Sequence, residues 1–387
     1  MKVLIAGLGS IGRRHLRNLL ALGQDDIVLY HTGHSTLPED ELAPFAVETD
    51  LKAALDHRPE AVIVANPNSL HLEVAIPAAE QGCHLLIEKP LSHTMEGVER
   101  LRQAVRSGGG QVLVGFQFRF HPGLQKVKQL ISSTPPPLTS KPSPPASTIG
   151  RPLSVHAHWG EYMPGWHPWE DYRHGYSARA DLGGGAILSL CHPLDYLRWL
   201  FGEVEALWAF AGRLGELELD VEDTAEIGLR FADGMLGSVH LDYNQRPPAH
   251  TLEVIGTQGM LRWDSVDGAV NLYQSPTPLS PPPAWVPVPP PAWASVRHRR
   301  ATPVRPWPRA GKEKNNRDEG EGWRVYPAPA GFERNDLFLA EMRHFLAVAR
   351  GEEQPICSLE DGIQALRLAV SARRSAETGQ MVMLRSE

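Results

Sequence analysis

Three short stretches of this 387-residue chain carry residue types that can act on a bound small molecule. The first is the glycine pattern Gly7-Leu8-Gly9-Ser10-Ile11-Gly12, which follows an apolar run and opens a stretch with helical spacing. In that setting Gly7 permits a tight turn, Gly9 lets a pyrophosphate approach the backbone, and Gly12 lets a helix pack closely on a strand. The unpaired N–H groups at the helix N-terminus then face the phosphates. The pattern therefore predicts a dinucleotide-binding site.

The identity of the dinucleotide depends on residues 30–35. An NAD site usually has an acidic residue about 20 positions after the glycines, where it binds the ribose hydroxyls. Here no acid occurs before Glu39, and His31, Thr32, His34 and Ser35 can instead hydrogen-bond a 2′-phosphate, although no arginine lies among them. We favour NADP as the cofactor and keep NAD as the alternative.

The second stretch is Glu88-Lys89-Pro90, at the C-terminal end of an apolar run. In a doubly wound sheet the carboxyl edge of such a strand faces the ligand crevice. Lys89 then reaches the reacting end of the dinucleotide, where its positive charge can stabilise a developing alkoxide. The alternative is an ordinary surface lysine, but the acid before it and the proline after it constrain the backbone unusually.

The third stretch, residues 159–173, mixes aromatic rings with charged and hydrogen-bonding side chains. Such a mixture stacks on sugar rings and binds their hydroxyls, and arginine can also hold a diphosphate. The alternative is a loop that only packs the domain interface. The residues from which we expect substrate contacts are Trp166, His167, Asp171, Tyr172 and Arg173.

Two further sets of residues are weaker candidates. Arg119 and His121 follow the last strand of the first domain, where substrate contact and a hinge role are both open. His156 and His158, drawn together with Glu161 and His167, lack the spacing of a convincing zinc site. We predict no metal.

The elements that must position these residues follow from the hydrophobic periodicity. Up to about residue 120, continuous apolar runs alternate with amphipathic helical stretches, which predicts a parallel sheet covered on both faces. Beyond it strands dominate, with one helix expected over residues 186–201 and two near the C-terminus, the last capped by Ser358. We expect an α/β Rossmann domain over residues 1–121 and, over residues 122–387, an α+β domain with an open, mostly antiparallel sheet.

Composition narrows the classes of function. Lysine and arginine total 38 and aspartate and glutamate 45, so the net charge of −7 gives no overall attraction to nucleic acid or to an anionic membrane. Three widely spaced cysteines form no CxxC pair, and no run of about 18 apolar residues occurs. We expect a cytoplasmic protein without nucleic-acid or membrane partners. Prolines number 34, with 12 in residues 276–308 and 6 in residues 135–145, which predicts surface insertions near residues 132–149 and 274–325.

Taken in order, these motifs resemble the glucose-fructose oxidoreductase / inositol dehydrogenase (Gfo/Idh/MocA) family. The likeness extends through Ala65-Asn66-Pro67-Asn68 with His71, through Gly183-Gly184-Gly185 with His192, and through the turn at residues 256–259. It implies a carbohydrate substrate, NAD or NADP, and an open sheet that often forms an oligomer interface, here in a homodimer or homotetramer. It also implies cofactor contacts from the glycine loop and from Asn66, Pro67, His71, Glu88, Lys89 and Gln117.

The resemblance also implies catalytic roles. In this family the lysine of the Glu-Lys-Pro motif sits beside the reacting hydroxyl, and a histidine after the glycine triplet is the general acid or base. Lys89 and His192 occupy these positions. Histidine suits the task because a base with a pKa near working pH must take the hydroxyl proton as the hydride leaves.

One departure from the family concerns the partner of this histidine. Many members have an aspartate four residues before it, whereas here Ser189 lies three residues before it. Asp195, three residues after His192, can share the helix face unless Pro193 kinks the helix. We expect both Ser189 and Asp195 at the substrate site.

The sequence therefore predicts an NAD(P)-dependent enzyme that moves a hydride to or from a carbinol or ketone carbon of a sugar, sugar derivative or sugar nucleotide. Two alternatives remain. One is a non-catalytic sensor of dinucleotide or sugar, which the missing aspartate favours. The other is a reductase of a non-sugar ring.

Overall fold

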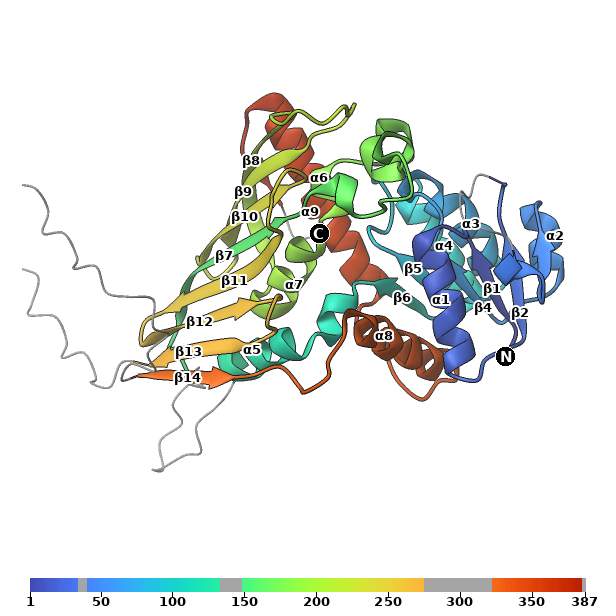
Figure 1. Cartoon of the computed structure of the whole chain (residues 1–387), viewed down its shortest axis with the longest axis horizontal. Coiled ribbons are helices and arrows are strands. Elements are labelled where there is room, and N and C mark those ends of the chain that lie inside the picture. Colours follow the sequence, from blue (N-terminus) through green and yellow to red (C-terminus); the bar gives the residue numbers. More distant parts are fainter. Residues whose placement is uncertain (34–39, 133–147, 275–321, 385–387) are drawn as a thin grey trace, which may run out of the picture.

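The computed structural model describes residues 1–33, 40–132, 148–274 and 322–384, which form two domains side by side (Figure 1). Most of the two predicted proline-rich insertions, and also His34 and Ser35, lie outside these residues. Within the described ranges, no helix has the length and apolar character needed to cross a membrane.

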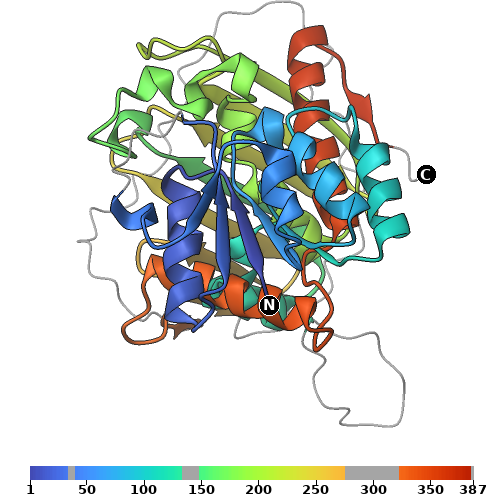
Figure 2. The same ribbon diagram turned by 90° about the vertical axis from the view of Figure 1, so that its right-hand side faces the viewer.

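The first domain is the expected Rossmann fold. Its six parallel strands lie in the order β3-β2-β1-β4-β5-β6, with helices on both faces (Figure 2). Every residue of β1 and β4 is buried, which explains why these strands are apolar throughout rather than alternating. The strands are β1 (Val3–Ala6), β2 (Ile27–Tyr30), β3 (Ala46–Glu48), β4 (Ala61–Val64), β5 (His84–Glu88) and β6 (Val112–Gly115), and the helices are α1 (Ser10–Ala21), α2 (Leu51–Asp56), α3 (His71–Glu80) and α4 (Val98–Gly108).

The second domain has a nine-stranded sheet in the order β14-β13-β12-β11-β7-β10-β9-β8-β15. Among the described strands of this sheet, only β7 and β10 pair in parallel, so the expected open, mostly antiparallel sheet is confirmed. Helices α5 (Pro122–Ser132), α7 (His192–Phe201) and α9 (Leu359–Thr378) cover the face that looks toward the first domain (Figure 1). The strands are β7 (Pro152–Gly160), β8 (Val204–Gly212), β9 (Thr224–Phe231), β10 (Leu236–Asp242), β11 (Ala249–Gly256), β12 (Gly259–Asp264), β13 (Val270–Gln274), β14 (Trp323–Tyr326) and β15 (Val382–Met383).

The single helix expected over residues 186–201 is wrong. The chain forms α6 (Ala186–Ser189), turns at Leu190 and Cys191, and restarts as α7 at His192. Pro193 explains the break, because proline has no N–H to donate to the carbonyl of Ser189 four residues earlier. That carbonyl is left free for another donor.

The last two helices return to the first domain. Helix α8 (Arg334–Ala349) lies beside α1 (Figure 2). The ring of Phe338 in α8 is 4.6 Å from the guanidinium carbon of Arg14 in α1. Just before α9, the carbonyl of Cys357 accepts a 2.9 Å hydrogen bond from the N–H of Val114 on the edge strand β6. The predicted cap of α9 is confirmed, since Ser358 Oγ accepts from the Asp361 N–H at 3.2 Å. The C-terminal helices therefore belong to both domains.

Candidate active site

The glycine loop has the geometry that a dinucleotide pyrophosphate needs. Gly7 adopts a φ of +95°, and a Cβ on it would lie 2.5 Å from the Asn66 nitrogen. A Cβ on Gly12 would lie 1.8 Å from the Gly7 carbonyl oxygen, whereas the space beside Gly9 is open. The loop thus packs tightly on Ala65 and Asn66, which follow β4, and is open beside Gly9, where Ser10 and Ile11 begin α1. These residues fit a dinucleotide.

The end of β2 offers polar groups and no carboxylate among residues 30–33. His31 Nδ1 accepts a 3.0 Å hydrogen bond from the Gly33 N–H, which fixes the turn that contains Thr32. The first described acids after β2 are Asp40 and Glu41 in η1 (Asp40–Leu42). Glu41 binds Arg17 at 2.6 Å and so is already paired.

The side chains of the Glu-Lys-Pro motif contact both domains. Glu88 ends β5 and its Oε1 lies 2.7 Å from His15 Nε2 on α1. Lys89 Nζ crosses the crevice and donates a 2.6 Å hydrogen bond to the Ser189 carbonyl, the acceptor that Pro193 leaves free. Burial opposes the charge on Lys89, but its interactions with Tyr176, Cys191 and Glu88 outweigh burial and raise its pKa. Lys89 therefore stays a cation at neutral pH.

A third carboxyl group lies beside this motif. Glu341 of α8 is 1% exposed, and neither of its oxygens has a hydrogen-bond partner among the described residues. An oxygen of Glu341, one of Glu88 and a ring nitrogen of His15 lie within 4.8 Å of one another. Burial, and then the charge of Glu88, raise the pKa of Glu341 well above its usual value. The group is thus a neutral acid under conditions in which Glu88 is ionised.

Residues 65–71 position the other motifs. Asn68 Nδ2 donates to the Gly183 carbonyl at 2.8 Å, which ties this loop to the glycine triplet of the second domain. The two ring nitrogens of His71 lie 2.9 Å from the carbonyls of Pro90 and Asn66. Because burial lowers the pKa of His71, its neutral ring has one N–H and donates to only one of these two carbonyls. The cofactor contacts expected from Asn66, Pro67 and His71 stay predictions.

His192 is the first residue of α7, and its ring packs against three aromatic side chains. Its ring stacks on Trp159 at 5.1 Å between centroids, with Phe116 and Phe118 edge-on at 5.6 and 4.9 Å. Its Nδ1 has no partner among the described residues. Burial, followed by the positive charges of Lys89 and other nearby groups, lowers the pKa of His192 well below its usual value. The ring is therefore uncharged at neutral pH, and its pKa lies below the value near working pH that the sequence analysis expects of the base.

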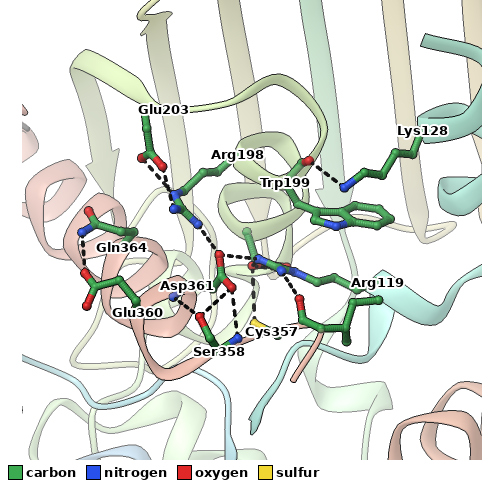
Figure 3. Close-up of polar contacts among 12 residues, drawn as sticks. Arg119, Lys128, Arg198, Trp199, Glu203, Cys357, Ser358, Glu360, Asp361 and Gln364 are labelled. Atoms are coloured by element: carbon green, nitrogen blue, oxygen red, sulfur yellow. Dashed lines mark hydrogen bonds and ion pairs between the residues drawn. The ribbon is translucent and has the colours of Figure 1, made fainter. Parts of the chain in front are cut away.

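Asp195 does not orient His192. Its carboxylate is buried and accepts two hydrogen bonds from Arg119, at 3.0 Å from Nε and 2.7 Å from Nη2. Arg119 also reaches Asp361 at 3.4 Å, where Arg198 joins it at 2.6 Å (Figure 3). This network joins the first domain to α7 and α9, and it leaves Arg119 and Asp195 no free group for a substrate. The structure therefore argues against the substrate contacts that we expected from these two residues.

His121 and Gln117, which both follow β6, differ in their surroundings. His121 is buried against Trp263 at 4.9 Å and accepts from the Gly123 N–H, and burial lowers its pKa to about 4. His121 packs in the interior, which argues against the substrate contact that we expected from it. Gln117 Oε1 is buried without a partner among the described residues, so it is available to accept a hydrogen bond from a ligand.

The aromatic loop divides into two parts. Trp166 Nε1 and His167 Nδ1 are buried without partners in the described structure, so they remain candidates for ligand contact. Asp171 and Arg173 instead bind each other at 2.7 Å near the surface, and the hydroxyl of Tyr172 accepts from the Glu218 N–H at 3.2 Å. Asp171, Tyr172 and Arg173 are thus already bound by other groups of the protein.

The histidines proposed as a weak metal set are not brought together. His156 Nδ1 pairs with Ser238 Oγ at 2.7 Å, whereas Glu161 accepts from the indole of Trp159 at 2.7 Å. His158 instead lies beside His240, with ring centroids 4.5 Å apart. The prediction of no metal stays a prediction.

Sequence reasoning missed the residues that α8 contributes. Arg334 begins α8, is exposed, and its positive charge lowers the pKa of His192 and opposes the rise in that of Lys89. More than 240 residues separate Arg334 and Glu341 from the Glu-Lys-Pro motif, and no spacing rule joins them. The only local signal is the helical periodicity of α8.

Comparisons with known proteins agree with this geometry. Family profiles match residues 1–116 (oxidoreductase family, NAD-binding Rossmann fold), 146–262 (GFO/IDH/MocA C-terminal domain) and 311–384 (oxidoreductase family, C-terminal alpha/beta domain). The chain is 26% identical to myo-inositol 2-dehydrogenase of Thermotoga maritima, over 99% of this chain and 98% of that protein. It is 29% identical to levoglucosan dehydrogenase of Pseudarthrobacter phenanthrenivorans, over 52% of this chain and about half (54%) of that protein.

Among solved structures, levoglucosan dehydrogenase in complex with NADH and levoglucosan superposes with a TM-score of 0.75, at 21% identity, over the whole of both chains. At that identity the likeness establishes the fold. The three profile matches cover most of both domains and agree with this fold. The chain belongs to the GFO/IDH/MocA family of oxidoreductases.

Proposed function

We propose that this chain is an NAD(P)-dependent oxidoreductase that transfers a hydride to or from a carbinol or ketone carbon of a sugar. The observation that carries the proposal is the contact of Lys89 Nζ with the Ser189 carbonyl, which brings the cation of the first domain to the start of the His192 helix. Two proteins to which the chain is similar are named as dehydrogenases of myo-inositol and of levoglucosan, which supports a substrate of this kind.

The roles follow from charge and proton affinity. The dinucleotide supplies the hydride acceptor or donor at the crevice. Neutral His192 takes the proton of the substrate hydroxyl during oxidation and returns it during reduction. Lys89, held as a cation, stabilises the negative charge that develops on the same oxygen. Trp166 and His167 supply ring stacking and hydrogen bonds to the sugar, and Ser189 lines the site through its carbonyl.

The test is turnover across a sugar panel, followed by absorbance at the nicotinamide band. We expect Lys89→Gln to lower kcat about 10²- to 10³-fold while the Kd for the reduced dinucleotide changes less than about twofold. Lys52→Gln, which removes an exposed lysine far from the crevice, is the matched control. Near-normal turnover of Lys89→Gln would contradict the assigned role. Dinucleotide binding without turnover of any sugar would favour the sensor.

For the finer identity of the cofactor we propose NADP. Support comes from the lack of a carboxylate among residues 30–33 at the end of β2, where an NAD site usually holds the ribose hydroxyls. Titration with NADPH and NADH, followed by fluorescence, should give the lower Kd for NADPH. A lower Kd for NADH would overturn this preference.

We also propose a cytoplasmic homodimer or homotetramer that associates through the open face of the nine-stranded sheet. Trp208, Phe210 and Leu236 on that sheet are 45%, 69% and 58% exposed, which is unusual for side chains of this size. All three cysteines are buried and unpaired, which suits a reducing compartment. Mass photometry should show an oligomer that Phe210→Glu weakens, and a monomer for the unsubstituted chain would contradict the proposal.

A further inference from the structure

The ring of His192 is not oriented by a carboxylate. Its Nδ1 is buried without a hydrogen-bond partner among the described residues, and Asp195, the acidic residue of the same helix, is bound to Arg119 instead. An imidazole turns about two side-chain bonds, whereas a base must present one nitrogen to the reacting hydroxyl within a narrow range of distance and angle. The orientation of His192 therefore depends on the aromatic rings around it.

One of these rings lies parallel to the imidazole. The planes of Trp159 and His192 differ by 19°, whereas Phe116 and Phe118 meet the same imidazole at 83° and 62°. A parallel indole packs along a face of the imidazole, and an edge-on ring touches it at fewer atoms. Because the interior is close-packed, a rotation of the imidazole out of its plane would drive it into the indole. Trp159 therefore sets the plane of the His192 ring.

The indole of Trp159 is itself held from two directions. Its Nε1 donates a 2.7 Å hydrogen bond to Glu161 Oε1, and its ring stacks on His250 with centroids 4.0 Å apart and planes 15° apart. Trp159 of β7 and His250 of β11 are direct partners in the antiparallel pair, where side chains on one face support each other. His250 packs in turn against Trp263, with ring centroids 4.9 Å apart. The indole thus has little freedom to tilt.

The strand that carries Trp159 is a firm support for this contact. Strand β7 lies inside the nine-stranded sheet and is paired on both sides, with β11 and β10 (Figure 1). His192 instead begins α7, directly after the break that separates α6 from α7. Core strands open less often than helix ends, and side chains that must be placed accurately are best supported by rigid elements. The orientation of a residue at a helix end is therefore fixed from the sheet.

We propose that Trp159 is a positioning residue of the reaction, whose indole holds the His192 imidazole in the orientation in which it exchanges a proton with the substrate hydroxyl. The inference rests on the proposed function and on the role given there to His192. It assigns Trp159 no contact with the sugar, so the expected effect is on the rate of the chemical step and not on binding. The competing role is that of a tryptophan that only packs the interior of the second domain.

The experiment measures kcat and KM in the full-length protein, with the sugar of the panel that gives the highest kcat/KM and with saturating dinucleotide. Trp159→Leu removes the flat ring and should lower kcat about 10- to 100-fold, because small displacements of a reacting group cost rate in this range. Its KM and the Kd for the dinucleotide should change less than about twofold. Trp159→Phe restores a ring that can stack and should return kcat to within about threefold of the unsubstituted protein.

Two further variants separate positioning from packing. Trp263→Leu removes a second buried tryptophan, which packs on His250 rather than on the His192 ring. It should lower the midpoint of urea unfolding as Trp159→Leu does, but change kcat less than about threefold. Glu161→Ala removes the hydrogen bond that fixes the indole and leaves the buried rings in place, so we expect it to lower kcat about three- to tenfold without a change in KM. This variant decides the question if Trp159→Leu does not fold.

Several results would overturn the inference while leaving the proposed function intact. One is a folded Trp159→Leu with kcat near that of the unsubstituted protein, or, where that variant does not fold, an unchanged kcat in Glu161→Ala. A second is a rise in KM with kcat unchanged, which would make Trp159 a substrate contact. A third is an equal loss of kcat in Trp159→Phe or in Trp263→Leu, which would indicate packing alone. Dinucleotide binding by the unsubstituted protein without turnover of any sugar refutes the proposed function and the inference together.

Discussion

Replacement of the buried Glu341 by glutamine tests the electrostatics of the crevice directly. Glu341 has both oxygens unpartnered among the described residues and lies in one cluster with Glu88 and His15. Because burial raises its pKa in the folded protein, the folded state keeps the proton at pH values where the unfolded chain has lost it. Glu341→Gln keeps the shape and removes the titration.

The sign and size follow from proton linkage. Between the ordinary glutamate pKa and the raised pKa of the folded protein, the native state binds one more proton than the unfolded state. The free energy of unfolding then falls by about 1.4 kcal/mol for each pH unit as pH rises, until the folded pKa is passed. This loss begins near pH 5 and is absent in Glu341→Gln. A buried glutamine amide without partners costs stability too, but by an amount that does not depend on pH.

The measurement is urea unfolding at half-unit steps from pH 5 to pH 8 for both proteins. The difference in unfolding free energy should shift in favour of Glu341→Gln by about 1.4 kcal/mol per pH unit over the lower part of this range. Glu352→Gln, at an exposed position just after α8, should follow the unsubstituted protein throughout. Parallel pH profiles for Glu341→Gln and the unsubstituted protein would refute the reasoning, because they would mean that Glu341 ionises normally.

Three other perturbations probe separate parts of the site. Gly12→Ala places a Cβ 1.8 Å from the Gly7 carbonyl oxygen, so we expect the Kd for NADPH to rise about tenfold or more in a fluorescence titration; an unchanged Kd would mean that the loop is not the pyrophosphate site. Asp195→Asn leaves the buried Arg119 with Asp361, 3.4 Å away, as its remaining charged partner, which should cost about 3 kcal/mol in urea unfolding, and a cost under about 1 kcal/mol would show that the pair is not buried in solution. Because burial lowers the pKa of His192, kcat/KM should stay level through pH 6.5, where an ordinary histidine base would be half protonated; a midpoint at pH 6.5 would contradict this.

Sequence predicted the parts of the site that depend on local backbone rules. The glycine loop, the strand before Glu88 and the doubly wound order are confirmed, because buried parallel strands read as continuous apolar runs and a phosphate loop needs glycine at fixed positions. The pairing of Asp195 with Arg119 was not predicted because helical spacing shows which residues share a face but not which guanidinium from another segment faces them.

The helix break at His192 could have been read from Pro193 alone. Proline at that position frees the carbonyl of Ser189, and the structure shows Lys89 bound there. The place of Glu341 beside Glu88 could not have been predicted, since it depends on how α8 returns to α1 over a long stretch of chain.

The hydrogen bond from Val114 to the Cys357 carbonyl has a consequence for protein engineering. It closes the open edge of β6, and a Cβ on Gly362 in α9 would lie only 2.5 Å from a methyl carbon of Val114. Residues 1–121 do not form a complete domain by themselves, because an isolated fragment would expose the edge of β6 to pairing with other chains. A chimera that borrows this nucleotide-binding half must therefore carry the C-terminal helices of the same parent, and recombination points inside residues 350–362 would break both halves.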